Sequence, residues 1–182
     1  MFEVRWHGRG GQGAFTAARL LGVAATLFGD RHALAFPSFG PERRGAPVLG
    51  FTRIDDRKVA DRSLITECDV VAVLDDTLLE PAVLDGLRPG GLFLVNTTRV
   101  ELTIVPPANV RTVLFDATSL AMQFLGRPIT NTAMLGALAA SGRLVGIQSV
   151  ILAVRHEMKG ALGEKNAALV EAAYTALGGE SI

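Results

Sequence analysis

The chain has 182 residues, of which 49% are hydrophobic, and its 18 basic side chains balance 18 acidic ones. This length suits one domain with a core of its own, so we expect residues 1–182 to form a single domain. Zero net charge argues against broad nucleic-acid binding. The single cysteine, Cys68, excludes a disulfide within the chain and a cluster held by four cysteines of this chain.

The sequence also gives no sign of a membrane protein. Its start lacks the basic-then-apolar pattern of a secretory signal. Its apolar stretches are too short and too often interrupted to cross a membrane. We therefore expect a soluble cytoplasmic protein that has no contact with a membrane.

The glycine-rich stretch 8–13 is the feature around which the sequence is organised. A short apolar run, Met1 to His7, leads into it, and a helical pattern begins at Ala14. Its glycines have the G-x-G-x-x-G spacing of a phosphate-binding turn between a strand and a helix. Glycine permits φ > 0 and leaves room for a ligand, and the first turn of a helix presents N–H groups to an anion. The alternative is a tight turn that binds nothing.

Hydrophobic periodicity predicts the elements that follow. Apolar residues at helical spacing predict a helix over Ala14–Phe28, and His32–Phe36 predicts a second strand. The proline- and glycine-rich segment 37–47 predicts a loop before a third strand, Val48–Ile54. Asp69–Asp75 encloses an unbroken apolar run, which is typical of a central parallel strand that is covered on both faces.

The pattern then predicts a helix over Leu78–Leu87 and strands over Leu92–Asn96 and Val110–Phe115. This order indicates an α/β fold with a doubly wound, mostly parallel, Rossmann-like sheet and flanking helices. Ligands of such sheets bind at the carboxyl ends of the strands. The C-terminal third is predicted to be helical, with helices over Ala117–Leu125, Thr132–Ala140, Ile147–Met158 and Lys165–Leu177. The second of these is apolar nearly all round, so it is buried in the domain or against a partner chain.

A dinucleotide site needs more than the glycine turn. It needs an acid at the end of the second strand to bind the ribose. The only acid in the predicted loop, Glu42, adjoins Arg43 and Arg44, which disfavours NAD. An arginine there suits a ribose phosphate, as in NADP or coenzyme A. A solvated loop or a salt bridge between subunits are the alternatives for these arginines.

The sequence offers no recognisable catalytic set. The three histidines lack metal-ligand spacing, and no serine lies in a nucleophile elbow. Polar residues follow two predicted strands at the ligand-binding edge, namely Asp75, Asp76 and segment 96–98. They either line a crevice there or only cap turns. We therefore expect no catalytic and no metal-binding residue in this chain.

Three segments together carry a family resemblance. They are Trp6–Gly13 (WHGRGGQG), Pro37–Val48 (PSFGPERRGAPV) and Asn131–Ala137 (NTAMLGA). They closely resemble the gamma subunit of pyruvate/2-oxoacid:ferredoxin oxidoreductases, the pyruvate synthase family, and the likeness extends over nearly the whole chain. The first two segments are long, which makes the resemblance specific.

The resemblance implies a subunit of an enzyme that oxidatively decarboxylates a 2-oxoacid, pyruvate above all. Coenzyme A and oxidised ferredoxin are consumed, and acyl-CoA, carbon dioxide and reduced ferredoxin are formed. The implied partners are alpha-, beta- and delta-type subunits, with ferredoxin reached through the complex. Thiamine diphosphate, Mg²⁺ and 4Fe–4S clusters would be held by those subunits and none by this chain, which alone is expected to be inactive.

The resemblance further implies that this chain assists coenzyme A binding and the assembly of the complex. Two other functions stay open: an NADP-binding reductase, which would use the same glycine turn, and an assembly subunit that contacts no ligand. The candidate residues for the coenzyme A contact are Gly8, Arg9, Gly10, Gly11, Gln12, Gly13, Ser38, Glu42, Arg43, Arg44 and Asn131.

Overall fold

The computed structural model describes residues 1–39, 46–142 and 144–179. In them, six strands form one sheet in the order β2-β3-β1-β4-β5-β6. β1, β4, β5 and β6 run parallel, and the β2–β3 hairpin joins them with β3 antiparallel to β1. The α/β class and the mostly parallel sheet are therefore confirmed. The strands are β1 (Phe2–Arg9), β2 (His32–Phe39), β3 (Pro47–Asp55), β4 (Cys68–Val73), β5 (Leu87–Asn96) and β6 (Arg111–Phe115).

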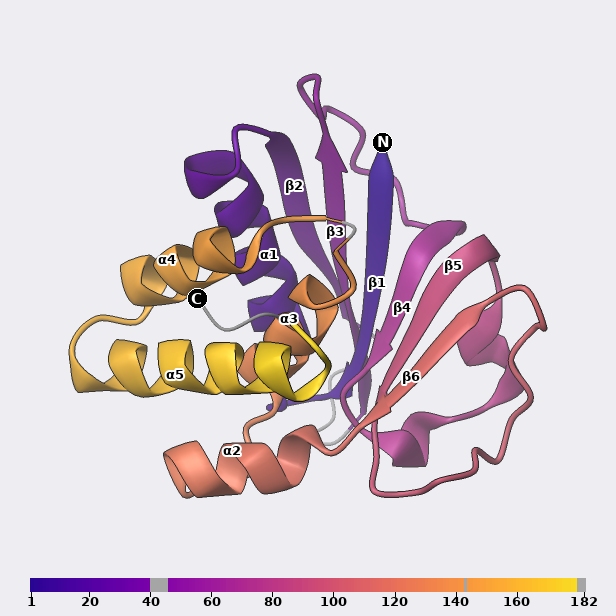
Figure 1. Cartoon of the computed structure of the whole chain (residues 1–182). Coiled ribbons are helices and arrows are strands. Elements are labelled where there is room, and N and C mark those ends of the chain that lie inside the picture. Colours follow the sequence, from indigo (N-terminus) through magenta and orange to yellow (C-terminus); the bar gives the residue numbers. More distant parts are fainter. Residues whose placement is uncertain (40–45, 143, 180–182) are drawn as a thin grey trace.

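The α-helices gather on one face of this sheet (Figure 1). One of them connects β1 to β2, and the others follow β6, so the predicted helical C-terminal third is confirmed. The observed bounds differ from the predicted ones by a few residues at most. The helices are α1 (Ala14–Phe28), α2 (Ala117–Leu125), α3 (Asn131–Ala139), α4 (Ile147–Glu157) and α5 (Ala161–Ala176).

The larger core lies between the sheet and these helices. Trp6 of β1 and Leu94 of β5 point into it, and alanines of α1 allow that helix to pack closely on the strands. All nine residues of α3 are buried, and α3 packs mainly on α5. The nearly uniformly apolar helix is thus buried in the chain's own core, which is one of the two environments that its sequence allowed.

The opposite face of the sheet has a different cover. Val71, Val73 and Phe93 point to this side, where connecting segments contribute Val83 and Ile104. Within residues 1–39, 46–142 and 144–179, no α-helix lies on this face. The apolar run of β4 is covered on both faces, as predicted, but the second cover is made of loops and short 3₁₀ turns.

The predicted helix Leu78–Leu87 is wrong. Two 3₁₀ turns, Asp76–Leu78 and Pro81–Leu84, occupy this connection, and β5 begins at Leu87. Proline restricts the preceding residue to extended backbone, and Glu80 has φ −137° and ψ 157°. The apolar spacing of this segment matches a helix, but Pro81 interrupts it.

The second strand is longer than predicted. β2 continues through Pro37 and Ser38 to Phe39, and Pro37 pairs with Gly50 of β3. Proline is tolerated here because β2 is an edge strand of the sheet. The predicted loop 37–47 is therefore wrong at both ends, because residues 37–39 belong to β2 and Pro47 begins β3.

Candidate functional site

The glycine turn connects the carboxyl end of β1 to the start of α1. Gly11 and Gly13 have φ values of 92° and 83°, which only glycine adopts readily. Three N–H groups of the turn donate within the chain: that of Arg9 to Gln12 Oε1 (2.7 Å), that of Gly10 to the Ala46 carbonyl (3.0 Å) and that of Gln12 to the Arg9 carbonyl (3.0 Å). These bonds shape the turn, so these three N–H groups are already engaged within the chain.

Gln12 and Arg9 join this turn to the end of β4. Gln12 Nε2 donates to Asp75 Oδ2 at 2.7 Å, and Arg9 Nε lies 3.2 Å from the same oxygen. The Thr77 hydroxyl accepts from Arg9 Nη2 at 2.8 Å and donates to Asp75 Oδ1 at 2.6 Å. Desolvation acts to raise the pKa of Asp75, but the hydrogen bonds from Thr77 and Gln12 and the charge of Arg9 hold it below its usual value. The Asp75 carboxylate thus already pairs with Arg9, the cation of the glycine turn.

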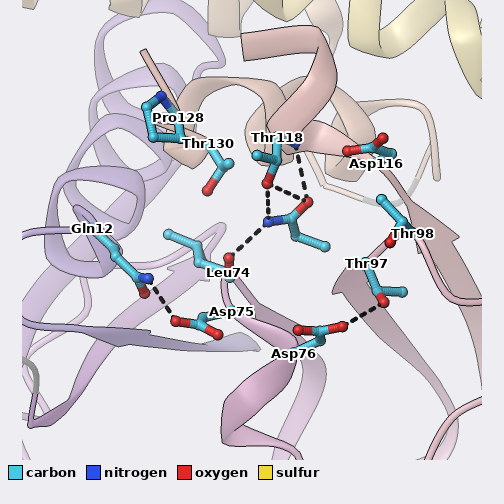
Figure 2. A pocket seen from close by; sticks show the side chains of 11 residues that line it. Gln12, Leu74, Asp75, Asp76, Thr97, Thr98, Asp116, Thr118, Pro128 and Thr130 are labelled. Atoms are coloured by element: carbon cyan, nitrogen blue, oxygen red, sulfur yellow. Dashed lines mark hydrogen bonds between the residues drawn. The ribbon is translucent and has the colours of Figure 1, made fainter. Parts of the chain in front are cut away.

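A cleft of about 440 Å³ opens at this edge of the sheet. Figure 2 shows Gln12 and Asp75 on one side of it and the Asp76–Thr97 pair on the other. Thr97 Oγ1 donates to Asp76 Oδ2 at 2.7 Å. Asp116 also lines the cleft, but its Oδ1 accepts the Ser119 N–H at the start of α2. The cleft is polar and rich in carboxylates, which suits hydroxyl and amide groups of a ligand better than bare phosphates.

The structure brings part of the predicted site together. Gly8 to Gly13 form one turn, and the Asn131 side chain at the start of α3 packs beneath it: a Cβ on Gly13 would lie 2.5 Å from Asn131 Nδ2. Ser38 does not join them, because it lines a separate cavity with Arg5 and His7. Glu42, Arg43 and Arg44 lie outside the described residues.

The ends of segment 40–45 are nevertheless well placed. Arg9 pairs with Pro47 in the β1–β3 ladder, and the Gly10 N–H donates to the Ala46 carbonyl. β2 runs parallel to β1, since both are antiparallel to β3. The end of β2 and the start of β3, which flank residues 40–45 in the sequence, therefore lie at the same edge of the sheet as the glycine turn.

The described residues offer little reactive chemistry. Burial, with the nearby charge of Arg5, lowers the pKa of His7 to about 3, so its imidazole is neutral near pH 7. Burial raises the pKa of the Cys68 thiol to about 11, so little reactive thiolate forms. No group of three or more His, Cys, Asp or Glu side chains in the described ranges is arranged to hold a metal ion. The arrangement can bind and orient, but these residues show no acid–base or nucleophilic set.

Known proteins share both this sequence and this fold. Residues 3–176 match the family model of pyruvate ferredoxin/flavodoxin oxidoreductase. The chain is 49% identical over 175 residues to pyruvate synthase subunit PorC of Methanocaldococcus jannaschii, with 96% of each chain covered. It is 48% identical over 178 residues to the pyruvate/ketoisovalerate oxidoreductases common subunit gamma of Thermococcus kodakarensis, again with 96% of each covered. The chain belongs to the pyruvate ferredoxin/flavodoxin oxidoreductase family.

A solved structure agrees with this assignment. The crystal structure of pyruvate oxidoreductase subunit PORC (EC 1.2.7.1) from Thermotoga maritima superposes with a TM-score of 0.82 at 35% identity. The superposition covers 96% of this chain and 95% of that chain. The family resemblance of the three sequence segments is confirmed: the chain is a gamma subunit of a pyruvate/2-oxoacid:ferredoxin oxidoreductase. None of its described helices is long and apolar enough to span a bilayer.

Sequence reasoning missed how the edge of the sheet is held together. Asp75 had been placed at this edge, but its bonds to Gln12, Arg9 and Thr77 had not been foreseen. The signal was present in part, since an Asp that follows a buried strand and stands two residues before a Thr predicts a local cap. The partner across the turn, 63 residues away in sequence, left no local signal.

Proposed function

We propose that this gamma subunit assists coenzyme A binding and holds the oxidoreductase complex together. The observation that carries the proposal is that the glycine turn meets the residues that flank segment 40–45 at one edge of the sheet. The glycine turn lies against Ala46 and Pro47. Arg43 and Arg44 precede these two residues by only a few positions in the sequence. In this proposal the glycine turn offers the start of a helix, and Arg43 and Arg44 contribute two guanidinium groups.

The chemistry of coenzyme A fits this combination. Coenzyme A carries a pyrophosphate and a separate ribose phosphate, whereas a 2-oxoacid carries neither. The first turn of α1 follows Gly13, which as the residue before the helix makes no side-chain cap. Its N–H groups and dipole favour an anion. Arginine forms paired hydrogen bonds with a phosphate, which matches the second phosphate group.

The remaining chemistry belongs to partner subunits in this proposal. Alpha-, beta- and delta-type subunits hold thiamine diphosphate, Mg²⁺ and 4Fe–4S clusters, and they decarboxylate the 2-oxoacid, pyruvate above all. The electrons pass to ferredoxin, and the acyl group passes to coenzyme A. The complex works in the cytoplasm. The described residues of this chain hold no cluster of metal ligands that would assign a cofactor to it.

The test is steady-state kinetics of the assembled complex. Arg43→Ala and Arg44→Ala should each raise the KM for coenzyme A by roughly one to two decades, equivalent to about 1.5–3 kcal/mol, and leave the KM for the 2-oxoacid nearly unchanged. Lysine at either position should restore part of the loss, because it keeps the charge without the planar fork. The matched control is Arg57→Ala, an exposed arginine in the turn at the opposite end of β3, which should change neither constant.

Three outcomes would count against the coenzyme A contact. An unchanged coenzyme A constant in an intact complex would leave only the assembly function. Loss of assembly in the arginine variants would show that they hold a subunit interface. Tight binding of NADPH by the purified chain, measured by its fluorescence, would favour the reductase.

The purified chain assayed with pyruvate, coenzyme A and a viologen should show no turnover.

A further inference from the structure

A groove of about 660 Å³ lies on the loop-covered face of the sheet. One wall is the connection between β4 and β5, and the other is the segment between β5 and β6. This groove is separate from the cleft beside the glycine turn, since the two share no lining residue. Its apolar walls are formed by Leu79, Pro81, Leu84, Ile104, Val105 and Pro107.

Two neighbouring residues of the second wall point in opposite directions. Ile104 is 9% exposed and packs into the core, whereas Val105 is 91% exposed. A single exposed valine is common, but Val105 extends the apolar wall of the groove into solvent, and contiguous apolar surface marks interaction sites. The groove therefore has the character of a surface that a protein segment covers.

The charges of the groove indicate which kind of segment it can bind. Its lining includes the carboxylates of Glu80 and Asp85 and no basic side chain. A segment that fits both properties presents apolar side chains to the walls and a Lys or Arg to the carboxylates. A second copy of this chain is disfavoured in a two-fold arrangement, because the same patch would then face itself and bring acid against acid.

We propose that this groove seats an apolar, basic-flanked segment of a partner subunit of the oxidoreductase. The proposal rests on the proposed function in one respect, namely that this chain assembles with the other subunits. It assigns the docking of those subunits to the loop-covered face. The glycine turn stays available for coenzyme A at the edge of the sheet.

The test is copurification of the other subunits with this chain after coexpression. Val105→Arg should weaken the recovery of partner subunits at least tenfold, because it places a long cation where an apolar side chain is covered. Val100→Arg is the matched control: Val100 is 92% exposed on the same segment and does not line the groove. Glu80→Lys should reduce recovery as well, and most strongly at low salt. Circular dichroism and thermal melting should show that all three variants are folded.

The outcomes separate the two proposals. If the wild-type chain recovers no partner subunit, the assembly function itself fails. If both the wild-type and Val105→Arg chains recover them equally, only the groove assignment fails. If the purified chain is instead a dimer that Val105→Arg dissociates, the occupant is a second copy, and the proposed partner is wrong.

Discussion

The helix-covered face and the loop-covered face of the sheet differ in their polar content. On β1, Val4 and Trp6 point to the helices and are buried among apolar residues, whereas Glu3, Arg5 and His7 alternate with them on the other side. Helices satisfy most of their backbone polar groups internally, so an apolar strand can face them. Loops present carbonyl groups that still need donors. The composition of each strand face follows from this difference.

Buried arginines meet that need on the loop-covered face. Arg5 is 7% exposed, and its Nη2 donates to the carbonyl groups of Val83 (2.9 Å) and Asp85 (2.6 Å). Arg53 is 3% exposed, and its Nη1 donates to the Asp61 carbonyl at 2.8 Å. Arg53 Nε also bonds Glu3 at 2.8 Å, which offsets the buried charge. Two arginines of the sheet thus fasten the loops that cover it.

The helix-covered face should be the less tolerant of added volume, and Gly136 tests this most severely. A Cβ on this α3 glycine would lie 2.1 Å from the Val170 carbonyl oxygen of α5, and backbone atoms cannot easily move away. Gly136→Ala should lower the free energy of unfolding by about 3 kcal/mol, the upper end of the usual cost of overpacking. Denaturant unfolding of the purified chain measures it. Gly146→Ala is the control: a Cβ there meets nothing within 4 Å, and its cost as the N-cap of α4 should stay near or below about 1 kcal/mol. Equal stability of the two variants would show that α3 and α5 are not tightly packed.

The loop-covered face should be the more sensitive to acid, because it contains His7. Burial and Arg5 lower the pKa of His7 from its ordinary value of 6.5 to about 3. Between those values the unfolded chain binds a proton that the folded chain does not, so stability falls as the pH falls. This contribution amounts to about 2 kcal/mol between pH 7 and pH 5.

His7→Gln should remove that part of the acid sensitivity. A glutamine oxygen can still accept a hydrogen bond such as the one that His7 Nε2 accepts from Arg5 Nε at 3.1 Å. Denaturant unfolding at pH 7 and at pH 5 gives the slope for each variant. His32→Gln, which replaces an exposed histidine, should keep the wild-type slope. If His7→Gln also keeps it, the imidazole is not held neutral by burial.

The sequence was a better guide to the helix-covered face than to the other. α1 and α2 have their predicted bounds. A glycine marks the end of each helix, and apolar residues recur at helical spacing within each one. The loop cover was mistaken for a helix at 78–87, since spacing alone does not show that Pro81 breaks the pattern. The Arg5 contacts with Val83 and Asp85 join residues about 80 apart in sequence, and periodicity carries no information about such pairs.

The site shows the same limit. The glycine turn and its place between strand and helix followed from residue types, and so did the position of Asp75 at the strand ends. Which side chain Asp75 contacts depends on the detailed course of the turn. Ser38 was grouped with the glycine turn because it lies in the family-like segment Pro37–Val48. Its place in the β2 ladder instead directs it toward the cavity that Arg5 and His7 line.

Substitution at the carboxyl ends of the strands, beside the glycine turn, should have the smallest effect on function. Asp75 tests it. The Asp75 carboxylate lies 3.2 Å from Arg9 Nε, so under the proposed function it competes with an incoming phosphate for that cation. Asp75→Asn should lower the KM for coenzyme A by roughly two- to fivefold, about 0.5–1 kcal/mol, as expected for a partly exposed ion pair. Asp116→Asn is the matched control, because it removes an equal charge from the same cleft without a contact to the glycine turn. Equal effects of the two variants would indicate only a general change of charge. A higher KM in Asp75→Asn would show that the carboxylate holds Gln12 and Arg9 in their binding positions, so that Asp75 supports the coenzyme A contact instead of opposing it.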